Sequence, residues 1–539
     1  MTEPEKKRPR RPQGRQPAPS APAVPATATR VLDPTTAIAV RGVQPRSTAY
    51  VGPRLLVSKS VDFDGALEVL RAVAEPLGWE VIPEEEDVRT RDLPFGVRAV
   101  RVLASTSVSA APDAFGLLQQ TRAHFGAKAV EGTGLDHVVF AGGLGADPFH
   151  ASNPFHASNP FHASNPFHAS NPFHASNPFH ASNPFHASNP AGELSYAVST
   201  YATPGSGGRQ PVSYIGPKPV RSEHVPGRRP VVAILDTGCA SHPWLDDVVQ
   251  KGIELDGQAI GYADPKTDPE VGGDLMGMLD GVIDPLSGHG TFIAGLVHQA
   301  CPDADLLVWR AVPSSGPIVE SDLVATLSQV VELVRRHRAG EPGGRAIDVL
   351  TLSMGYYHET PEDELFDPTL HGLLAELGRL GTLVVSSAGN AATTRPSFPA
   401  AFAPWSDGAG PVAADSTVLP VVSVGALNPS GRSDALFTNT GPWVRVYVPG
   451  AALVSTMPAF EGGLQPVART KVLGRVRESI DPDDFSGGFG VWSGTSFAAP
   501  LFAGRVAATL GALPEDETAA DMVDRIWGVL AEVADMTPD

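Results

Sequence analysis

The stretch Ser493-Gly494-Thr495-Ser496-Phe497-Ala498-Ala499-Pro500 organises the rest of the chain. Gly494 permits a close backbone approach just before Ser496, and the small residues that follow predict a buried helix with one thin face. This turn would place the Ser496 hydroxyl at a helix N-terminus, where free N–H groups and the helix dipole favour a developing negative charge. A hydroxyl is a weak nucleophile without a base that a third group orients. A nucleophilic serine at this turn therefore requires both groups elsewhere in the chain.

Both groups are present. An apolar β run over 231–235 ends at Asp236-Thr237-Gly238, which is how a buried parallel strand delivers a carboxylate to the C-terminal edge of a sheet. Gly288-His289-Gly290-Thr291 then opens a helix predicted over 292–299, with His289 in its first turn. The chain order is Asp236, His289, Ser496, which is the order of subtilisin and differs from that of chymotrypsin-like enzymes and α/β-hydrolases.

With these motifs, residues 228–512 resemble a subtilisin-like serine protease (subtilase, peptidase family S8). Two further strings fit in family order, Leu352-Ser353-Met354-Gly355 and Ser386-Ser387-Ala388-Gly389-Asn390. Each string alone is weak, but five in the family's order exclude chance.

The resemblance implies a role for each matching residue. Asp236 orients His289, His289 takes the Ser496 proton and then gives it to the leaving amine, and the Asn390 amide and the Ser496 N–H stabilise the oxyanion. The substrate-binding residues are expected to be Ser353, Met354 and Gly355, which pair with the substrate backbone, and Ser387, Ala388 and Gly389. The alternative to an active endopeptidase is a catalytically dead scaffold, which the intact set of acid, base, nucleophile and oxyanion donor disfavours.

Between these motifs, short apolar runs alternate with helical patterns. Strands are predicted over 231–235, 306–310, 349–353, 383–387 and 421–424, and helices over 292–299, 321–338 and 368–380. This alternation predicts an α/β fold with a parallel sheet flanked by helices, and the resemblance implies a subtilisin-like arrangement of it over residues 228–515. A C-terminal helix is expected over 516–539. No metal site is assigned and no cofactor is required, although the acidic loop over 246–284 makes calcium a candidate because calcium sites are common in subtilases.

The region before the protease has three parts. Residues 1–48 are rich in Lys, Arg and Pro and predict a disordered tail, either a plain solvated tail or a basic arm for an acidic partner. Residues 49–145 have the βαββαβ order of a small α+β ferredoxin-like domain, which resembles the inhibitory propeptide of subtilases; an unrelated α+β domain is the alternative. Residues 191–227 predict a linker, and we expect self-cleavage between 142 and 229.

Residues 146–190 repeat the hexapeptide Asn-Pro-Phe-His-Ala-Ser, with histidines at 150, 156, 162, 168, 174, 180 and 186. A proline in every repeat excludes a continuous helix or a central strand. Four interpretations stay open: a low-complexity spacer, a weak metal-binding series, an array that binds a partner through avidity, and a set of core peptides. In the last, the repeats resemble His-x-Ser precursor peptides that a peptide-modifying enzyme alters and the protease releases. The alternative function is therefore a precursor or scaffold whose repeats are the product.

Composition limits the remaining functions. The net charge of −19 over 539 residues indicates a soluble protein and argues against a nucleic-acid partner. Cys239 and Cys301 are the only cysteines, so a disulfide framework is excluded, and one bridge between them is the lesser alternative to two thiols. The absence of a signal-like segment and of an 18-residue apolar run predicts a cytoplasmic protein with no membrane partner, with export by another route left open. The expected partners are a peptide or protein substrate and the chain's own N-terminal domain and linker.

Overall fold

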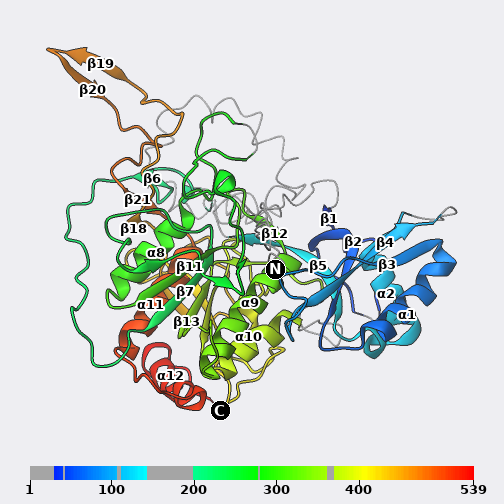
Figure 1. Ribbon diagram of the computed structural model, residues 1–539. Coiled ribbons are helices and arrows are strands. Elements are labelled where there is room, and N and C mark those ends of the chain that lie inside the picture. The colour runs from blue at the N-terminus through cyan, green and yellow to red at the C-terminus, as the bar shows by residue number, and fades with distance from the viewer. Residues whose placement is uncertain are drawn as a thin grey trace, which may run out of the picture.

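The computed structural model describes residues 29–40, 43–105, 111–141, 198, 200–276, 279–360 and 369–538. The repeats over 146–190 and residues 1–28 of the predicted tail lie outside these ranges. Two units are seen side by side in Figure 1, a larger one built on a parallel sheet and a smaller N-terminal one. None of the described helices is long and apolar enough to cross a lipid bilayer.

The larger unit contains a seven-stranded sheet in which all neighbouring strands are parallel. Its buried strands are short apolar runs, as expected for a sheet covered on both faces. In spatial order the strands are β17 (Val446–Pro449), β16 (Val421–Leu427), β15 (Leu383–Ser387), β13 (Val349–Leu352), β7 (Val231–Asp236), β11 (Asp305–Arg310) and β8 (Val249–Gln250). The predicted parallel α/β sheet is therefore present, and its central strands end at one edge.

Alternating side chains of each strand divide between two cores. In β7, Val232 and Ile234 join one hydrophobic cluster, and Ala233 and Leu235 join the other. The first cluster holds α8 (His289–Ala300), α11 (Thr495–Leu510) and α12 (Ala519–Ala534). The second holds α9 (Glu320–Arg338) and α10 (Thr369–Arg379). The helices thus cover both faces of the sheet.

The C-terminal helix is shorter than predicted. It begins at Ala519 because Thr518 and Asp521 form a capping box, and it ends at Ala534, where Asp535 takes a left-handed conformation. The prediction over 516–539 is therefore correct in type and too long at both ends.

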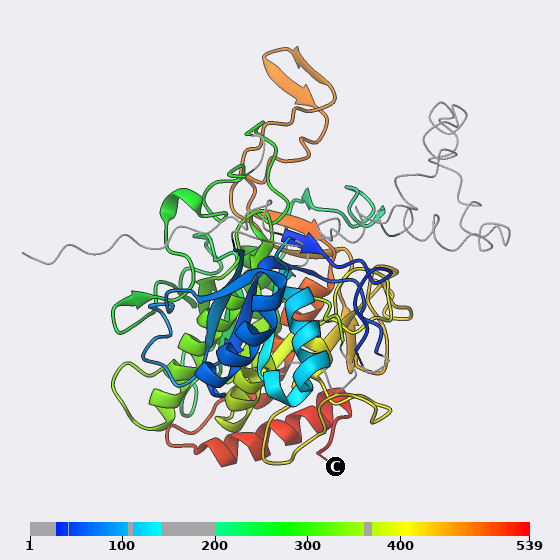
Figure 2. The same ribbon diagram turned by 90° about the vertical axis from the view of Figure 1, so that its right-hand side faces the viewer.

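The N-terminal unit shows the predicted element order. Its elements are β2 (Ala49–Ser58), α1 (Phe63–Ala74), β3 (Trp79–Pro83), β4 (Val97–Ala104), α2 (Ala114–Phe125) and β5 (Thr133–Ala141). The strands pair antiparallel in the order β5-β2-β4-β3. Figure 2 looks onto this unit and shows α1 and α2 side by side on its outer face, where they enclose a hydrophobic core of their own.

Part of the predicted tail is folded. β1 (Thr29–Val31) pairs antiparallel with β2, and Leu32 and Val40 are buried. Arg46 N–H and the Thr48 hydroxyl donate to backbone carbonyls of Glu359 and Tyr357 in the larger unit. The prediction of a disordered tail over 1–48 is therefore wrong for residues 29–40 and 43–48, because a few apolar side chains and backbone pairing order this segment.

The predicted linker is also partly built into the protein. The Tyr201 hydroxyl donates to Asn428 Oδ1 at 2.7 Å, and the Ser493 hydroxyl donates to the Gly207 carbonyl at 2.7 Å. β6 (Gln210–Pro211) pairs with β21 (Phe489–Trp492). Residues 200–211 therefore belong to the larger unit and are not a free connection.

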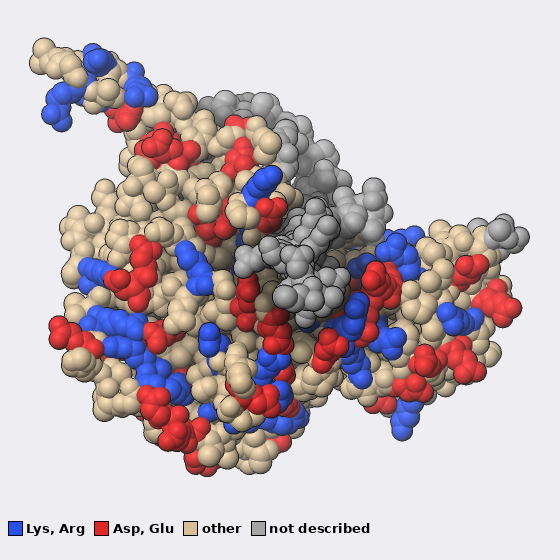
Figure 3. Space-filling view, viewed as in Figure 1, with Lys and Arg blue, Asp and Glu red and all other residues tan. Residues whose placement is uncertain are grey.

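The described residues also form a hairpin and several short elements. β19 (Arg469–Val472) and β20 (Arg475–Glu478) form a hairpin that projects from the body in Figures 1 and 2, and Figure 3 shows Lys and Arg side chains gathered on it. The other short elements of the described residues are β9 (Glu254–Leu255), β10 (Gln258–Ala259), β12 (Pro317–Val319), β14 (Met354–Gly355), β18 (Leu453–Thr456) and 3₁₀ turns at Glu75–Leu77, Ala127–Val130, Pro265–Thr267 and Ala400–Phe402.

Candidate active site

The acid and the base meet where β7 ends and α8 begins. His289 Nδ1 donates to Asp236 Oδ1 at 2.7 Å, and both side chains are fully buried. Asp236 Oδ1 also accepts the Thr237 N–H at 2.8 Å. Because Nδ1 carries the proton in this hydrogen bond, Nε2 has the free lone pair. Among the described residues none hydrogen-bonds to His289 Nε2.

Packing fixes the position of His289. Gly288, which precedes it, has φ +83°, and a Cβ there would lie 2.9 Å from Met457 and Pro458. The imidazole packs against the rings of Trp492 and Phe497, with centroids 5.5 and 5.1 Å away. The ring is thus held by aromatic neighbours on one side and by Asp236 on the other.

Ser496 lies in the first turn of α11, as the sequence predicts. The predicted thin face is present: a Cβ on Gly504 would lie 2.6 Å from Ala300 Cβ and 3.1 Å from the Val297 carbonyl of α8. Gly504 therefore lets α8 and α11 pack closely, and the starts of these helices carry His289 and Ser496. The Ser353 hydroxyl donates to the Ser496 carbonyl at 2.8 Å, which ties the end of β13 to this turn.

The Asn390 amide is oriented by the residue before the serine. Its Oδ1 accepts the Thr495 N–H at 2.8 Å and the Thr495 hydroxyl at 2.9 Å. Gly389 N–H donates to Thr495 Oγ1 at 3.0 Å. Gly389 has φ +99°, and a Cβ at this position would lie 2.5 Å from the side-chain nitrogen of Asn439. Since its oxygen faces Thr495, the Asn390 NH₂ group is the end that can donate toward the serine turn.

The remaining predicted residues also lie at this sheet edge. Ser387 ends β15, and Ala388 continues the pairing by donating its N–H to the Val424 carbonyl at 2.9 Å. Met354 and Gly355 form β14, directly after β13 and Ser353. The structure therefore gathers the ends of β7, β13 and β15 with the starts of α8 and α11.

The strand expected to pair with a substrate pairs with the N-terminal unit instead. β5 lies between β14 and β12 and is antiparallel to both, with Met354 opposite Ala141, Gly355 opposite Phe140, and Ile318 opposite Val139. Val139 and Ala141 are buried in the hydrophobic cluster of the larger unit. The end of the N-terminal unit thus occupies the position of an extended peptide beside Ser353.

A second group of contacts joins the two units. Asp136 of β5 accepts the N–H and the hydroxyl of Ser321, both at 3.0 Å, at the start of α9, where backbone donors lack intrahelical partners. Arg54 forms an ion pair with Asp136 at 3.2 Å. Burial outweighs these contacts and raises the pKa of Asp136 to about 6.

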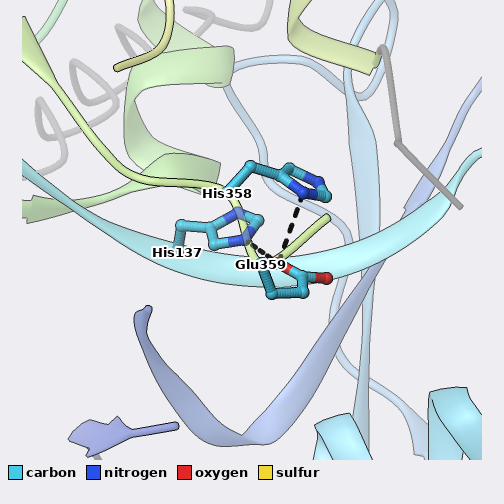
Figure 4. A group of neighbouring side chains, drawn as sticks. All are labelled: His137, His358 and Glu359. Atoms are coloured by element: carbon cyan, nitrogen blue, oxygen red, sulfur yellow. Dashed lines mark hydrogen bonds and ion pairs between the residues drawn. The ribbon is translucent and has the colours of Figure 1, made fainter. Parts of the chain in front are cut away.

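His137, the next residue of β5, lies in a buried ionic cluster (Figure 4). Its Nδ1 contacts Glu320 at 2.6 Å and its Nε2 contacts Glu359 at 2.9 Å. Burial acts against the charged ring, but the two carboxylates prevail and raise the pKa of His137 to about 10. His358 also approaches Glu359, at 3.5 Å.

His137, His358 and Glu359 are also the types of residue that bind metals, and their ligand atoms lie within 4.8 Å of one another. However, carboxylates engage both ring nitrogens of His137, and His358 Nδ1 accepts the Thr360 N–H at 3.0 Å. Protons and hydrogen bonds therefore account for the group, and it is best described as an ion-paired contact between the two units.

Sequence reasoning missed several residues near the site. Asp136 and His137 gave no signal because their partners in the larger unit lie more than 180 positions away. Glu270, a buried acid that contacts the residues following Asp236 and His289, lies in the loop whose acidity suggested only calcium. Cys239 and Cys301 are both free and buried, so the alternative of a bridge between them is wrong.

Comparison with known proteins identifies nearly the same region as the predicted protease domain, residues 228–515. Residues 227–527 match a sequence model described as "Subtilase family". Mycosin-4 of Mycobacterium tuberculosis is 27% identical over 321 residues, which cover 55% of this chain and 58% of the relative. A thermophilic serine proteinase of Bacillus sp. AK1 is 27% identical over 237 residues, covering 42% of this chain and 45% of the relative. The chain thus spans about half the length of these curated relatives.

Two solved structures are similar at the level of TM-score 0.33. A cold-adapted subtilisin-like serine proteinase is 18% identical, and the match covers 57% of this chain and 87% of that one. A lanthipeptide protease is 19% identical, with 53% of this chain and 74% of that one covered.

Proposed function

We propose a mechanism and a mode of control for this chain on the premise that it belongs to the subtilase family and is a serine-type endopeptidase. The observation that supports the proposal is the hydrogen bond from His289 Nδ1 to Asp236, made by two fully buried side chains next to the serine turn. Asp236 orients the ring, His289 Nε2 takes the Ser496 proton, and Ser496 Oγ attacks the scissile carbonyl. His289 then gives that proton to the leaving amine as the scissile C–N bond breaks, and water hydrolyses the resulting acyl-enzyme in a second, mirrored step.

The oxyanion is stabilised by two donors in this proposal. One is the Asn390 amide, whose oxygen Thr495 holds, and the other is the Ser496 N–H at the start of α11. The helix dipole adds to them because the negative charge develops at its N-terminus. Ser353, Met354 and Gly355 bind the substrate backbone, and Ser387, Ala388 and Gly389 lie beneath its scissile residue.

The N-terminal unit is proposed to be a ferredoxin-like propeptide that inhibits the enzyme in cis. Its support is the antiparallel pairing of β5 between β12 and β14, with two side chains buried among those of the larger unit. A peptide that occupies this position excludes a substrate from the same backbone donors and acceptors.

Self-processing is proposed to occur between residues 142 and 199. The expected window of 142–229 narrows because residues 200–211 are hydrogen-bonded and paired into the larger unit. Cleavage upstream of this segment leaves the protease intact. Calcium is not needed for the proposed chemistry, and its role in stability is tested by adding a chelator.

Intact-mass measurement of wild type beside Ser496→Ala tests this proposal. We expect only wild type to break, upstream of residue 200. If neither chain breaks, self-processing is wrong; if both break equally, the cut is made by another protease.

The alternative function concerns the repeats, which lie between the two units in sequence. Two cuts on either side of 146–190 would release them, as expected of a precursor whose product a peptide-modifying enzyme has altered. The same mass spectra distinguish the functions: a precursor yields excised Phe-His-Ala-Ser fragments with added or lost mass, and a self-maturing protease yields none.

A further inference from the structure

Glu270 is a buried carboxylate placed directly behind the two catalytic segments. Its Oε1 accepts the Thr237 hydroxyl at 2.5 Å and the Gly290 N–H at 3.1 Å, and its Oε2 accepts the Thr291 hydroxyl at 2.5 Å. Thr237 follows Asp236, and Gly290 and Thr291 follow His289. One side chain therefore joins the residues adjoining the acid to those adjoining the base.

The two segments meet so closely that they need such a contact. A Cβ on Gly290 would lie 2.0 Å from the Gly238 carbonyl, and Thr291 Oγ1 accepts the Ala240 N–H at 2.7 Å. Glu270 also lies at the start of α8, where backbone N–H groups lack intrahelical acceptors and the dipole favours an anion. A cap from a distant loop thus holds the helix that carries His289.

The Thr237 hydroxyl has two competing acceptors. It lies 2.5 Å from Glu270 Oε1 and 3.1 Å from Asp236 Oδ1, and its oxygen accepts the Gly290 N–H at 2.7 Å. A hydroxyl has one proton and can donate it to one acceptor at a time. When Glu270 is ionised, the hydroxyl donates to Glu270; when Glu270 is protonated, Glu270 donates to Thr237 and the hydroxyl turns to Asp236.

We propose that Glu270 is a positioning residue for catalysis, which holds the Asp236 and His289 segments together and sets, through Thr237 Oγ1, whether the catalytic aspartate receives an additional hydrogen bond. An additional donor on Asp236 draws charge away from its bond to His289 Nδ1 and weakens the support of the imidazolium form. The ionised state of Glu270 is therefore the more active one. This inference rests on the triad roles proposed above.

The surroundings of Glu270 allow it to change charge near neutral pH. The titratable groups that interact with it are Asp236 at the end of β7, Cys239 just after that strand, and Asp268 of its own loop. Burial raises the pKa of Glu270 to about 7, the two threonine hydroxyls act against that rise, and the aspartates add to it. Since the pKa of Glu270 is raised in the folded protein, Glu270 becomes ionised as pH rises through about 7. The more active arrangement, with Thr237 donating to Glu270, is gained over the same pH range.

Glu270→Gln tests the proposal on the full chain incubated to constant activity, with a short chromogenic peptide as substrate. Its amide donates to Thr237 as protonated Glu270 would, and its oxygen can still accept from Thr291. We expect kcat per titrated active site to fall about tenfold, as for one hydrogen bond, with KM within about twofold of wild type. The acid limb of the pH profile loses the ionisation near pH 7.

Two variants serve as controls. Lys266→Gln removes a charge from the same loop at an exposed side chain, so kcat should stay within about twofold. In a Thr237→Val background the hydroxyl is absent, so Glu270→Gln should have little further effect on kcat. If Thr237→Val does not fold, the pH profile of Glu270→Gln decides alone.

The proposal is overturned if Glu270→Gln keeps the kcat and pH profile of wild type, or if only its melting temperature falls. Failure of the triad assignment is distinguishable, because Ser496→Ala would then retain activity.

Discussion

At the residue scale, the threonines beside Asp236 and Ser496 make the contacts that orient the candidate site. Thr495 orients the amide that serves Ser496, and Thr237 contacts both Asp236 and Glu270. The motif strings therefore contain not only the reacting groups but also the side chains that orient them.

Asn390→Asp separates these two roles. The carboxylate keeps an acceptor for Thr495 but loses the NH₂ donor and adds a negative charge where the oxyanion forms. We expect kcat to fall by about 10²–10³ with little change in KM, a magnitude known from subtilisin itself. Asn390→Ala removes both roles and should also lower the melting temperature. Equal kcat for wild type and Asn390→Asp, measured with a peptide substrate, would exclude Asn390 as a donor.

At the element scale, one close helix contact, one open helix position and one exposed hairpin lead to different expectations for mutation. α8 and α11 meet at Gly504, whereas Gly528 of α12 has no atom within 4 Å of a Cβ. Glycine is therefore required at the first position and only costs backbone entropy at the second.

Gly504→Ala and Gly528→Ala form a matched pair. The first forces Ala300 and Val297 away and should destabilise the protein by about 1–3 kcal/mol and reduce activity, since it displaces the helices that carry His289 and Ser496. The second should stabilise it by about 0.5–1 kcal/mol. Urea unfolding of both variants measures the difference, and a stable, fully active Gly504→Ala would contradict the close-packing argument.

Replacing residues 469–478 by Gly-Gly should leave stability and peptide hydrolysis unchanged. All eight strand residues of the β19–β20 hairpin are exposed, so their removal uncovers no core. Phe460→Ala is the contrasting variant in the segment that precedes the hairpin. Phe460 is buried beside Gly288, so its loss should lower the free energy of unfolding by about 3–5 kcal/mol. Thermal unfolding distinguishes them, and a large loss from the hairpin deletion would show that the hairpin supports the fold.

At the scale of the whole molecule, the contact between the two units depends on charge. Glu320 contacts one ring nitrogen of His137 and Glu359 contacts the other, and all three side chains are buried. Figure 4 shows the Glu359 contact. The pKa of Glu359 is lowered, because its histidine neighbours prevail over burial. Removing one partner leaves buried, uncompensated charge, which is costly.

The docking of the N-terminal unit should therefore depend on pH. The pKa of His137 is raised from 6.5 to about 10. Its stabilisation of the docked state is therefore full below about pH 6.5 and is lost as pH rises through about 10. Because the pKa of Glu359 is lowered from 4.5, its stabilisation of the docked state is lost as pH falls into the acid range. The measurement is hydrogen exchange of the β5 backbone amides in the Ser496→Ala variant, corrected for the intrinsic exchange rate at each pH. We expect this exchange to be slowest between about pH 4.5 and 6.5.

His137→Gln should accelerate that exchange at pH 6 and flatten its rise toward alkaline pH. His124→Gln, an exposed histidine of the same unit, is the control and should behave as wild type. Unchanged protection in His137→Gln would show that backbone pairing alone holds the unit.

The sequence by itself determined the parallel α/β sheet, the order of Asp236, His289 and Ser496, and the element order of the N-terminal unit. These follow from local patterns: apolar runs that end in polar turns, glycines before catalytic residues, and helical spacing. Only the tertiary structure decided that β5 pairs with β12 and β14, that His137 lies between two glutamates, that residues 29–40 and 43–48 are folded and that Glu270 joins the segments of Asp236 and His289. Each of these is a contact between residues distant in sequence, whose energy depends on burial and on approach within hydrogen-bonding distance, and no local pattern encodes either.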